Sequence, residues 1–213
     1  MKINANELDR TKLPNLLSKN QNIGIELGVA KGDYSYILYK SNKFKKLYGV
    51  DSYEDHHQPE YLIALEKFFS FDNYHLLKCK FEEAIDLFPD EYFDFIYIDG
   101  YAHTGQEAGR TLSQWYPKLK IGGIFSGDDY DAKWPLTVKA VNNFSSTIGE
   151  KLNITGVNNY NDYSKYKSWY LVKNKKYINL NEGNIEIPII NKIENKLLLI
   201  KNKFKYFLKS KLF

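Results

Sequence analysis

The sequence lacks the residues that tie small secreted folds together, because Cys79 is its only cysteine among 213 residues. A single thiol excludes an internal disulfide, which is typical of proteins kept in a reducing compartment. The first ten residues, MKINANELDR, hold no apolar segment of the kind that a secretory signal needs. No apolar run reaches the roughly 18 residues of a membrane-spanning helix. We therefore expect a cytoplasmic protein with one core of ordinary size.

The chain also lacks a basic surface spread along its length. Its net charge is +4, but the last 22 residues, Lys192–Phe213, contain seven Lys and one Glu. The other 191 residues therefore carry a net charge of −2. A nucleic-acid-binding domain needs a positive stripe on its folded surface, so this charge distribution argues against nucleic acid as a partner.

The same 22 residues predict a basic amphipathic helix. Three- and four-residue steps place one set of apolar side chains on a single stripe, and these are Ile193, Leu197, Ile200, Phe204, Phe207 and Leu208. The stripe could pack on the domain or on a second subunit, or it could contact an anionic membrane at the inner face; disorder is the third alternative. Residues 174–191 are expected to be a polar connector from a domain formed by residues 1–173.

What the sequence does contain is a regular alternation of short apolar runs and helix-like stretches. The runs typical of buried strands are 22–27, 46–51, 74–79, 93–99 and 122–127. Helical patterns follow them at 33–41, 59–70, 81–88, 105–116 and 135–146. Two further runs, 152–157 and 168–173, predict an antiparallel hairpin. The predicted fold is α/β: a Rossmann-like, seven-stranded, mostly parallel sheet with helices on both faces and a terminal antiparallel hairpin.

The first predicted strand leads into a glycine loop, IELGVAKGDYS. Gly28 and Gly32 allow a tight turn and a close approach of the backbone to a ligand, and Glu26 offers a carboxylate that could meet an ammonium group. Asp51 ends the second strand, where an acid can accept hydrogen bonds from ribose hydroxyls. Together, the loop and the acid predict a nucleotide-like ligand. The alternative is a strand-to-helix turn that merely needs glycine.

These segments, IELGVAKGDYS and GVDSYED, resemble the first two motifs of class I S-adenosylmethionine-dependent methyltransferases. YFDFIYIDG and WYPKLKIGGIFSGDDY extend the resemblance, over about residues 23–172, to the small-molecule and sugar O-methyltransferase branch. The resemblance implies that Glu26 meets the methionine amino group, that Gly28 and Gly32 shape the loop around the methionine part, and that Asp51 holds the ribose. It also implies that Lys80 and Phe81 flank adenine and that Asp99 belongs to the cofactor site.

Carboxylates stand at the predicted ends of the fourth and fifth strands: Asp99, Asp128 and Asp129. Parallel strand ends share one edge of a sheet, so we expect these side chains to converge. Converging carboxylates favour a hard cation such as Mg²⁺ or Mn²⁺, and the resemblance to metal-dependent catechol and macrolide-sugar O-methyltransferases implies the same. Such a cation would lower the pKa of an acceptor hydroxyl and orient its oxygen. The alternative is a solvated acidic turn in which Asp129 caps the next segment; Asp131 is expected to be a solvated loop residue.

His103 lies four residues beyond Asp99 and is the predicted general base, because imidazole titrates near neutral pH. Asp128 is the second predicted catalytic residue. His56 and His57 lack the spacing of a zinc site and are expected to lie in a solvated loop. The leading function is therefore S-adenosylmethionine-dependent methyl transfer to a hydroxyl of a sugar, a glycoconjugate or another small polar acceptor, with a divalent metal.

Three alternatives to this function stay open. A metal-independent methyltransferase would use His103 alone as the base. A non-catalytic protein of the same fold would only bind the cofactor, although the intact Glu26, Asp51 and Asp99 argue against it. An NAD-dependent enzyme is disfavoured, because the spacing E-x-G-x-x-x-G differs from the G-x-G-x-x-G of dinucleotide loops.

Overall fold

The computed structural model describes residues 8–54, 58–99, 102–157 and 165–176, with the backbone alone at 102 and 103. His56 and His57 lie outside the described residues. So do the connector from residue 177 onward and the predicted basic helix 192–213. The three roles considered for that helix therefore stay predictions.

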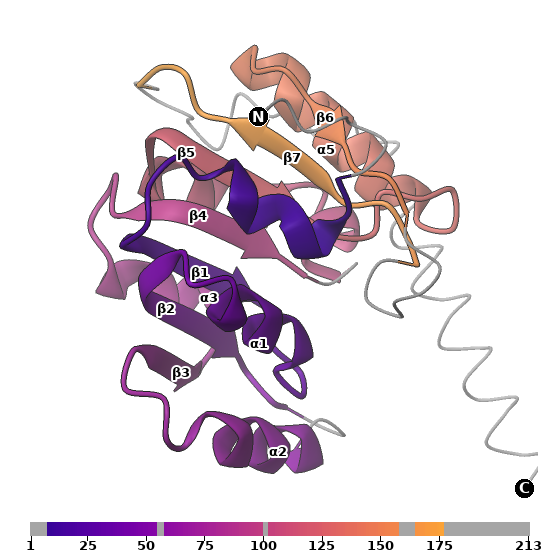
Figure 1. Cartoon of the computed structure of the whole chain (residues 1–213). Helices are drawn as coiled ribbons and strands as arrows, with labels where there is room; N and C mark the ends of the chain where they lie inside the picture. The colour runs from indigo at the N-terminus through magenta and orange to yellow at the C-terminus, as the bar shows by residue number, and fades with distance from the viewer. Residues whose placement is uncertain (1–7, 55–57, 100–101, 158–164, 177–213) are drawn as a thin grey trace, which may run out of the picture. The chain divides into compact units, whose positions relative to one another are not determined.

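The described strands form one seven-stranded sheet in the order β3-β2-β1-β4-β5-β7-β6 (Figure 1). They are β1 (Asn22–Leu27), β2 (Phe44–Asp51), β3 (Tyr74–Lys78), β4 (Phe93–Ile98), β5 (Leu119–Gly127), β6 (Asn153–Ile154) and β7 (Trp169–Val172). β1 to β5 pair in parallel, whereas β7 runs antiparallel to both β5 and β6. The predicted α/β fold and its edge hairpin are confirmed, and β7 rather than β6 lies beside β5.

One α-helix follows each parallel strand. These helices are α1 (Asp33–Lys40), α2 (Gln58–Phe68), α3 (Phe81–Ala84), α4 (Arg110–Trp115) and α5 (Pro135–Ile148). Shorter helical segments are the 3₁₀ helices η2 (Arg10–Leu16), η4 (Ile85–Leu87) and η6 (Tyr116–Lys118), and the π-helix η5 (Ala102–Gln106). None of the helices in the described ranges is long and apolar enough to cross a membrane.

The core lies on both sides of the sheet, because successive side chains of a strand point to opposite faces. On one face, Tyr97 of β4 packs on Tyr34 of α1 with ring centroids 4.3 Å apart, and Leu13 of η2 joins the same cluster. On the other face, Phe125 of β5 contacts Phe144 of α5 at 5.8 Å. Figure 1 shows η2 and α1 on one side of the sheet and α5 on the other. The helices therefore cover both faces, and η2 covers part of the face shared with α1.

The predicted helix 105–116 is wrong in one respect, because it is broken in two. The π-helix η5 ends at Gln106, and α4 begins at Arg110. Between them, Ala108 has a φ of 53° and Gly109 a φ of 84°, and a right-handed helix cannot continue through left-handed residues. The amide of Gly109 donates to the carbonyl oxygen of Thr104 at 3.0 Å, which stabilises the turn between the two helices.

Candidate functional site

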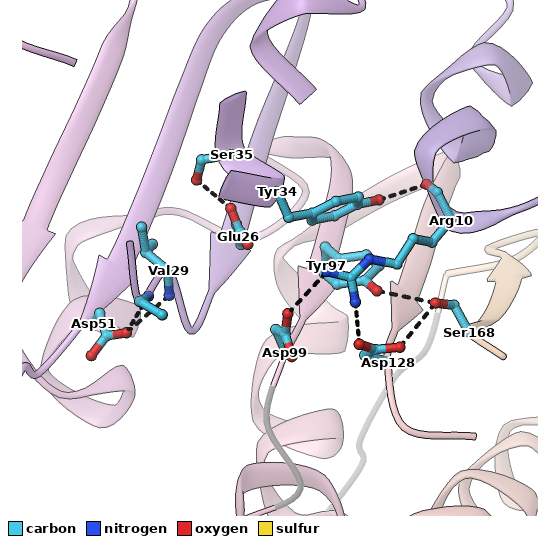
Figure 2. Close-up of polar contacts among 11 residues, drawn as sticks. Arg10, Glu26, Val29, Tyr34, Ser35, Asp51, Tyr97, Asp99, Asp128 and Ser168 are labelled. Carbon is cyan, nitrogen blue, oxygen red and sulfur yellow. Dashed lines mark hydrogen bonds and ion pairs between the residues drawn. The ribbon is translucent and has the colours of Figure 1, made fainter. Parts of the chain in front are cut away.

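The carboxyl ends of the central parallel strands meet at one edge of the sheet. Leu27 lies beside Val50 and Ile98, and Ile98 lies beside Gly127. The strand ends and the positions directly after them therefore place four of the predicted residues along this edge: Gly28, Asp51, Asp99 and Asp128. Figure 2 shows the three acidic residues. Glu26 is the penultimate residue of β1, next to this edge. The structure thus brings the glycine loop and the acidic residues together.

Position 28 requires glycine, because the backbone of the loop approaches the backbone of Asp99 closely there. The φ of Gly28 is 96°, and a Cβ atom at this position would overlap the carbonyl oxygen of Asp99. The Gly28 amide donates to Val50 O at 2.8 Å, and the Asp99 amide donates to Leu27 O at 2.8 Å. The start of the glycine loop is therefore fixed against the ends of both neighbouring strands, β2 and β4.

Gly32 allows a helix of the domain to pack on the loop. It precedes α1 with a φ of 76°, and a Cβ atom there would overlap the ring of Phe68 at the end of α2. The Phe68 ring in turn stacks on Tyr74 of β3, with centroids 3.8 Å apart. The absence of a side chain at Gly32 thus lets the loop pack against Phe68. Its predicted role in shaping the loop around methionine stays a prediction.

The carboxylate of Asp51 holds the glycine loop in place. Its Oδ2 accepts from the amide of Val29 at 2.9 Å (Figure 2) and from that of Ala30, also at 2.9 Å. Its Oδ1 accepts from the amide of Tyr53 at 2.9 Å. A carboxylate has about four acceptor positions, and these bonds use three of them. Asp51 therefore has capacity for a further donor at Oδ1, and it already orders the backbone on both sides of the site.

Glu26 is a buried carboxyl group, 1% exposed, beneath the glycine loop. The Ser35 hydroxyl donates to it, and the Tyr74 hydroxyl lies 2.7 Å from Ser35 Oγ. Burial raises the pKa of Glu26 well above its ordinary value, although the Ser35 bond acts in the opposite direction. A cationic group placed beside Glu26 would favour its charged form, which fits the predicted contact with an ammonium group.

The substitution Glu26→Gln should stabilise the ligand-free protein at alkaline pH. Because the pKa of Glu26 is higher in the folded protein than in the unfolded chain, ionising it costs folding free energy. This cost is absent below the unfolded-state pKa, grows as the pH rises, and stays constant above the folded-state pKa. Glutamine has nearly the same shape and never carries the charge.

Urea denaturation at about pH 4 and about pH 8 tests this expectation, since the slope of stability with pH reports the difference in bound protons. The free energy of unfolding should exceed the wild-type value at the higher pH and approach it at the lower one. Glu66→Gln, an exposed site on α2, should change neither. A Glu26→Gln variant that is less stable than the wild type at both pH values would contradict the assigned burial penalty.

Lys80 and Phe81, predicted to flank adenine, stand at the start of α3. The side chain of Lys80 is exposed, with its Nζ 3.3 Å from Glu54 Oε1. Phe81 is 6% exposed, so its ring is committed to the core. The amide of Lys80 donates to Glu83 Oε2 at 2.9 Å, which caps the short helix. The contact of these residues with adenine stays a prediction.

Arg10 enters the site from η2, 118 positions before Asp128 in the sequence. Its Nη1 donates to Asp128 Oδ2, and its Nη2 lies 3.7 Å from Asp99 Oδ2 (Figure 2). The other oxygen of Asp128 accepts from Ser168 Oγ at 3.2 Å. The side chains of Arg10 and Asp128 are 9% and 11% exposed, whereas that of Asp99 is 31% exposed. Asp99 is therefore the carboxylate of this pair that a ligand can reach more easily.

Several contacts hold Arg10 in this position. Its guanidinium carbon lies 4.6 Å from the ring centroid of Tyr34 and 5.8 Å from that of Tyr97, both within the range of cation–π attraction. The Tyr34 hydroxyl donates to the Arg10 carbonyl oxygen at 2.9 Å. Burial disfavours the charged guanidinium, but Tyr97, Asp99 and Asp128 outweigh it, and the pKa of Arg10 lies well above its ordinary value.

Sequence reasoning missed Arg10 because nothing in NELDR marks it as a site residue. The available signal was compositional: Arg10 is one of two arginines among 30 basic residues. Arginine differs from lysine in presenting a planar fork of donors that matches carboxylates. A rare arginine in a lysine-rich chain therefore indicates a position where that fork is needed.

The predicted divalent-cation site does not match the arrangement of the described residues. Within the described ranges, no group of three or more His, Cys, Asp or Glu side chains is arranged to hold a metal ion. The guanidinium of Arg10 instead contacts Asp99 and Asp128, the two carboxylates expected to be ligands. The third, Asp129, has a φ of 60°. In this arrangement the carboxylate oxygens do not form the oxygen shell that Mg²⁺ or Mn²⁺ requires.

Two further predicted residues lie in the loops that border the site. The backbone of His103 is in η5, which follows β4, but its side chain is outside the described part of the chain. Its predicted role as the base stays a prediction. Asp131, expected to be a solvated loop residue, orders the turn before α5, because its Oδ1 accepts from Lys133 N at 3.0 Å and its carbonyl oxygen accepts from Trp134 N at 2.9 Å.

Comparison with known proteins connects this site to one class of enzymes. Residues 25–130, which span the glycine loop and the acidic turn, match the model of a family described as a methyltransferase domain. Comparison with curated proteins gave no significant match.

Solved structures with the same fold include several methyltransferases. An rRNA methylase from Streptococcus thermophilus is 15% identical, with a TM-score of 0.59 over 82% of this chain and 99% of that one. A candidate methyltransferase from Streptococcus mutans, in complex with S-adenosylhomocysteine, is 18% identical, with a TM-score of 0.59 over 81% and 99%. A candidate S-adenosylmethionine-dependent methyltransferase from Methanococcus maripaludis is 15% identical, with a TM-score of 0.56 over 79% and 84%. At these identities the likeness establishes the fold.

Proposed function

We propose that this chain is an S-adenosylmethionine-dependent methyltransferase that methylates a hydroxyl group of a small polar acceptor, with a sugar or glycoconjugate as the acceptor class. The match of residues 25–130 to a methyltransferase domain supports the methyl-transfer activity. The acceptor is a small molecule and not a nucleic acid in this proposal, because the net positive charge lies in the last 22 residues and the other 191 residues carry a net charge of −2. The resemblance of the acidic turn to that of sugar O-methyltransferases supports the acceptor class.

The observation that carries the proposal is the contact between the glycine loop and the acidic pair. The backbone of Gly28 packs on the backbone of Asp99, so a ligand on the loop would lie next to the accessible carboxylate of Asp99. Carboxylates accept hydrogen bonds, and a polyhydroxylated acceptor supplies donors for them. This arrangement suits an acceptor that approaches the cofactor from the side of β4 and β5.

The residues of the cofactor side fit S-adenosylmethionine, which when bound supplies a methyl carbon activated by its sulfonium group. Asp51 has capacity to accept from a ribose hydroxyl at Oδ1 while its Oδ2 holds Val29 and Ala30. Glu26 is buried where an ammonium group would relieve the cost of its charge. Both residues bind and orient, and neither exchanges atoms with the substrate.

The acceptor side has to align an oxygen and remove a proton. The acceptor oxygen forms a bond to the methyl carbon as the carbon–sulfur bond breaks, sulfur keeps the electron pair, and the hydroxyl proton passes to a base. We assign the base role to His103, which follows Asp99 by four positions. Alignment of the reacting atoms is the larger contribution expected from the protein. No step of this proposal requires a metal, since the carboxylates that would bind it contact Arg10.

Two measurements test this function in sequence. Calorimetry should show saturable binding of S-adenosylhomocysteine and none of NAD⁺; binding of NAD⁺ alone would contradict the cofactor assignment. The full-length protein and S-(trideuteriomethyl)-adenosylmethionine are then incubated with one class of candidate acceptor at a time. The candidate acceptors are nucleoside-diphosphate sugars, methyl glycosides, catechol, putrescine and a short RNA. Mass spectrometry should find the label on a sugar hydroxyl. Label on putrescine or RNA, with none on any hydroxyl compound, would contradict O-methylation of a small acceptor.

A further inference from the structure

We propose that Arg10 is a positioning residue whose guanidinium group takes the place of a divalent ion between Asp99 and Asp128. The enzyme therefore works without added metal. This inference rests on the proposed function only for its effect on turnover. The placement of Arg10 is a property of the ligand-free site and can be tested without an acceptor.

The first argument is the charge balance at the ends of β4 and β5. Two carboxylates this close repel each other, and the repulsion grows when they leave water. The guanidinium of Arg10 contacts both, directly at Asp128 and at 3.7 Å from Asp99. It therefore supplies the positive charge that a metal would otherwise bring, and it does so from the chain itself.

The second argument is that Arg10 is built into the fold. The chain holds its side chain in contact with two tyrosine rings and its backbone by a bond from Tyr34. The segment η2 is anchored by Leu13, which is 0% exposed, and its first turn is capped by Asp9, which accepts from Thr11 N at 2.9 Å. A side chain fixed in this way stays in the site, whereas an exposed arginine would exchange its carboxylate partners with water.

The third argument is the orientation of Asp128. Arg10 binds one of its oxygens and Ser168 donates to the other, and Ser168 Oγ is also 3.1 Å from the Tyr97 hydroxyl. Asp128 is therefore held on both sides and is nearly buried, which leaves Asp99 as the more accessible carboxylate. In this arrangement Arg10 and Asp128 fix the position of Asp99, and Asp99 faces the acceptor.

One donor of the Arg10 side chain makes no hydrogen bond. Its Nε is buried and has no hydrogen-bond partner among the described residues. A buried donor without a partner is costly, so the contacts of Nη1 with Asp128 and of Nη2 with Asp99 have to offset that cost. A lysine could not reproduce these two contacts, because it lacks the planar fork.

The decisive test is a titration of the full-length protein with MnCl₂ in the presence of S-adenosylhomocysteine. Electron paramagnetic resonance measures how much Mn²⁺ is bound at each step. Wild type should bind no Mn²⁺ through the acidic pair, so Asp128→Asn should give the same titration. Arg10→Met should gain one bound Mn²⁺ that is lost again in the double variant Arg10→Met/Asp128→Asn. Arg110→Met, at the other arginine and exposed on α4, should behave like wild type.

Two results would overturn the proposal. The first is Mn²⁺ that binds to the wild type and not to Asp128→Asn, a comparison that does not depend on whether an Arg10 variant folds. A folded Arg10→Met protein that gains no Mn²⁺ site would also overturn it, because the guanidinium would then not be standing in for a cation. Thermal denaturation identifies which variants are folded.

The effect on turnover is measured with the acceptor found in the labelling panel. Wild-type activity should be unchanged by EDTA, and Arg10→Met should lower kcat about 100-fold, the size typical for loss of one preorganised electrostatic group, with affinity for S-adenosylhomocysteine within about twofold. Arg10→Lys should recover part of the loss. Activity abolished by EDTA, or unchanged in Arg10→Met, would overturn the role. If no acceptor is methylated, the proposed function fails while the Mn²⁺ result stands.

Discussion

Gly28→Ala should destabilise the protein more than any other single substitution at the glycine loop and should abolish cofactor binding. The residue adopts a φ of 96°, and an added Cβ atom would overlap the carbonyl oxygen of Asp99. The backbone conformation alone costs a non-glycine residue about 1–3 kcal/mol. The overlap is with backbone, which cannot move aside as a flexible side chain could. We therefore expect a loss of at least about 3 kcal/mol, a large part of the stability of an ordinary domain.

Gly122→Ala is the matched control for this prediction. Gly122 has a φ of 80°, yet no atom lies within 4 Å of the position where its Cβ would be. It should therefore show the conformational cost of about 1–2 kcal/mol without the overlap, and it should bind S-adenosylhomocysteine normally. Urea denaturation and calorimetry measure both quantities. Equal losses in the two variants would show that the contact between Gly28 and Asp99 is relaxed at little cost.

Asp51→Ala should weaken binding of S-adenosylhomocysteine about 10- to 150-fold, which corresponds to about 1.5–3 kcal/mol for a lost hydrogen bond to a charged group. The substitution also removes contacts within the protein, because the amides of Val29, Ala30 and Tyr53 all donate to this carboxylate. The variant should lose stability as well, and part of the lost affinity should come from a disordered loop.

A second carboxylate allows these two effects to be separated. Asp94, the second residue of β4, accepts from the amide of Ile23 at 2.8 Å and pairs with Lys120 at 3.0 Å. It lies at the amino ends of β1 and β4, across the sheet from the site. Asp94→Ala should therefore lower stability while leaving the dissociation constant unchanged. An unchanged dissociation constant in Asp51→Ala would overturn the assignment of Asp51 to the cofactor.

The strand and helix pattern could be predicted because it depends on local sequence. The run FDFIYI is largely apolar on both faces, as is typical of a central parallel strand, and it became β4. NIGIEL became β1, with apolar side chains on one face and Glu26 on the other. The glycine loop and the acid at the end of β2 could also be predicted, because parallel strands of one sheet share an edge at their carboxyl ends. The failure within helix 105–116 has a local cause, since the left-handed turn at Ala108 and Gly109 leaves little trace in an otherwise helical pattern.

The sequence by itself determined the fold class, the order of strands and helices, and the edge at which the glycine loop, Asp51, Asp99 and Asp128 meet. The tertiary structure alone decided which cation faces the acidic pair. Arg10 and Asp128 are 118 positions apart, and no periodicity or spacing connects residues that meet only when η2 packs on the sheet. Neighbouring carboxylates require a positive charge nearby in the folded protein, but that requirement does not specify whether an ion or a side chain supplies it. The packing of η2 on α1 and β4 supplies a guanidinium.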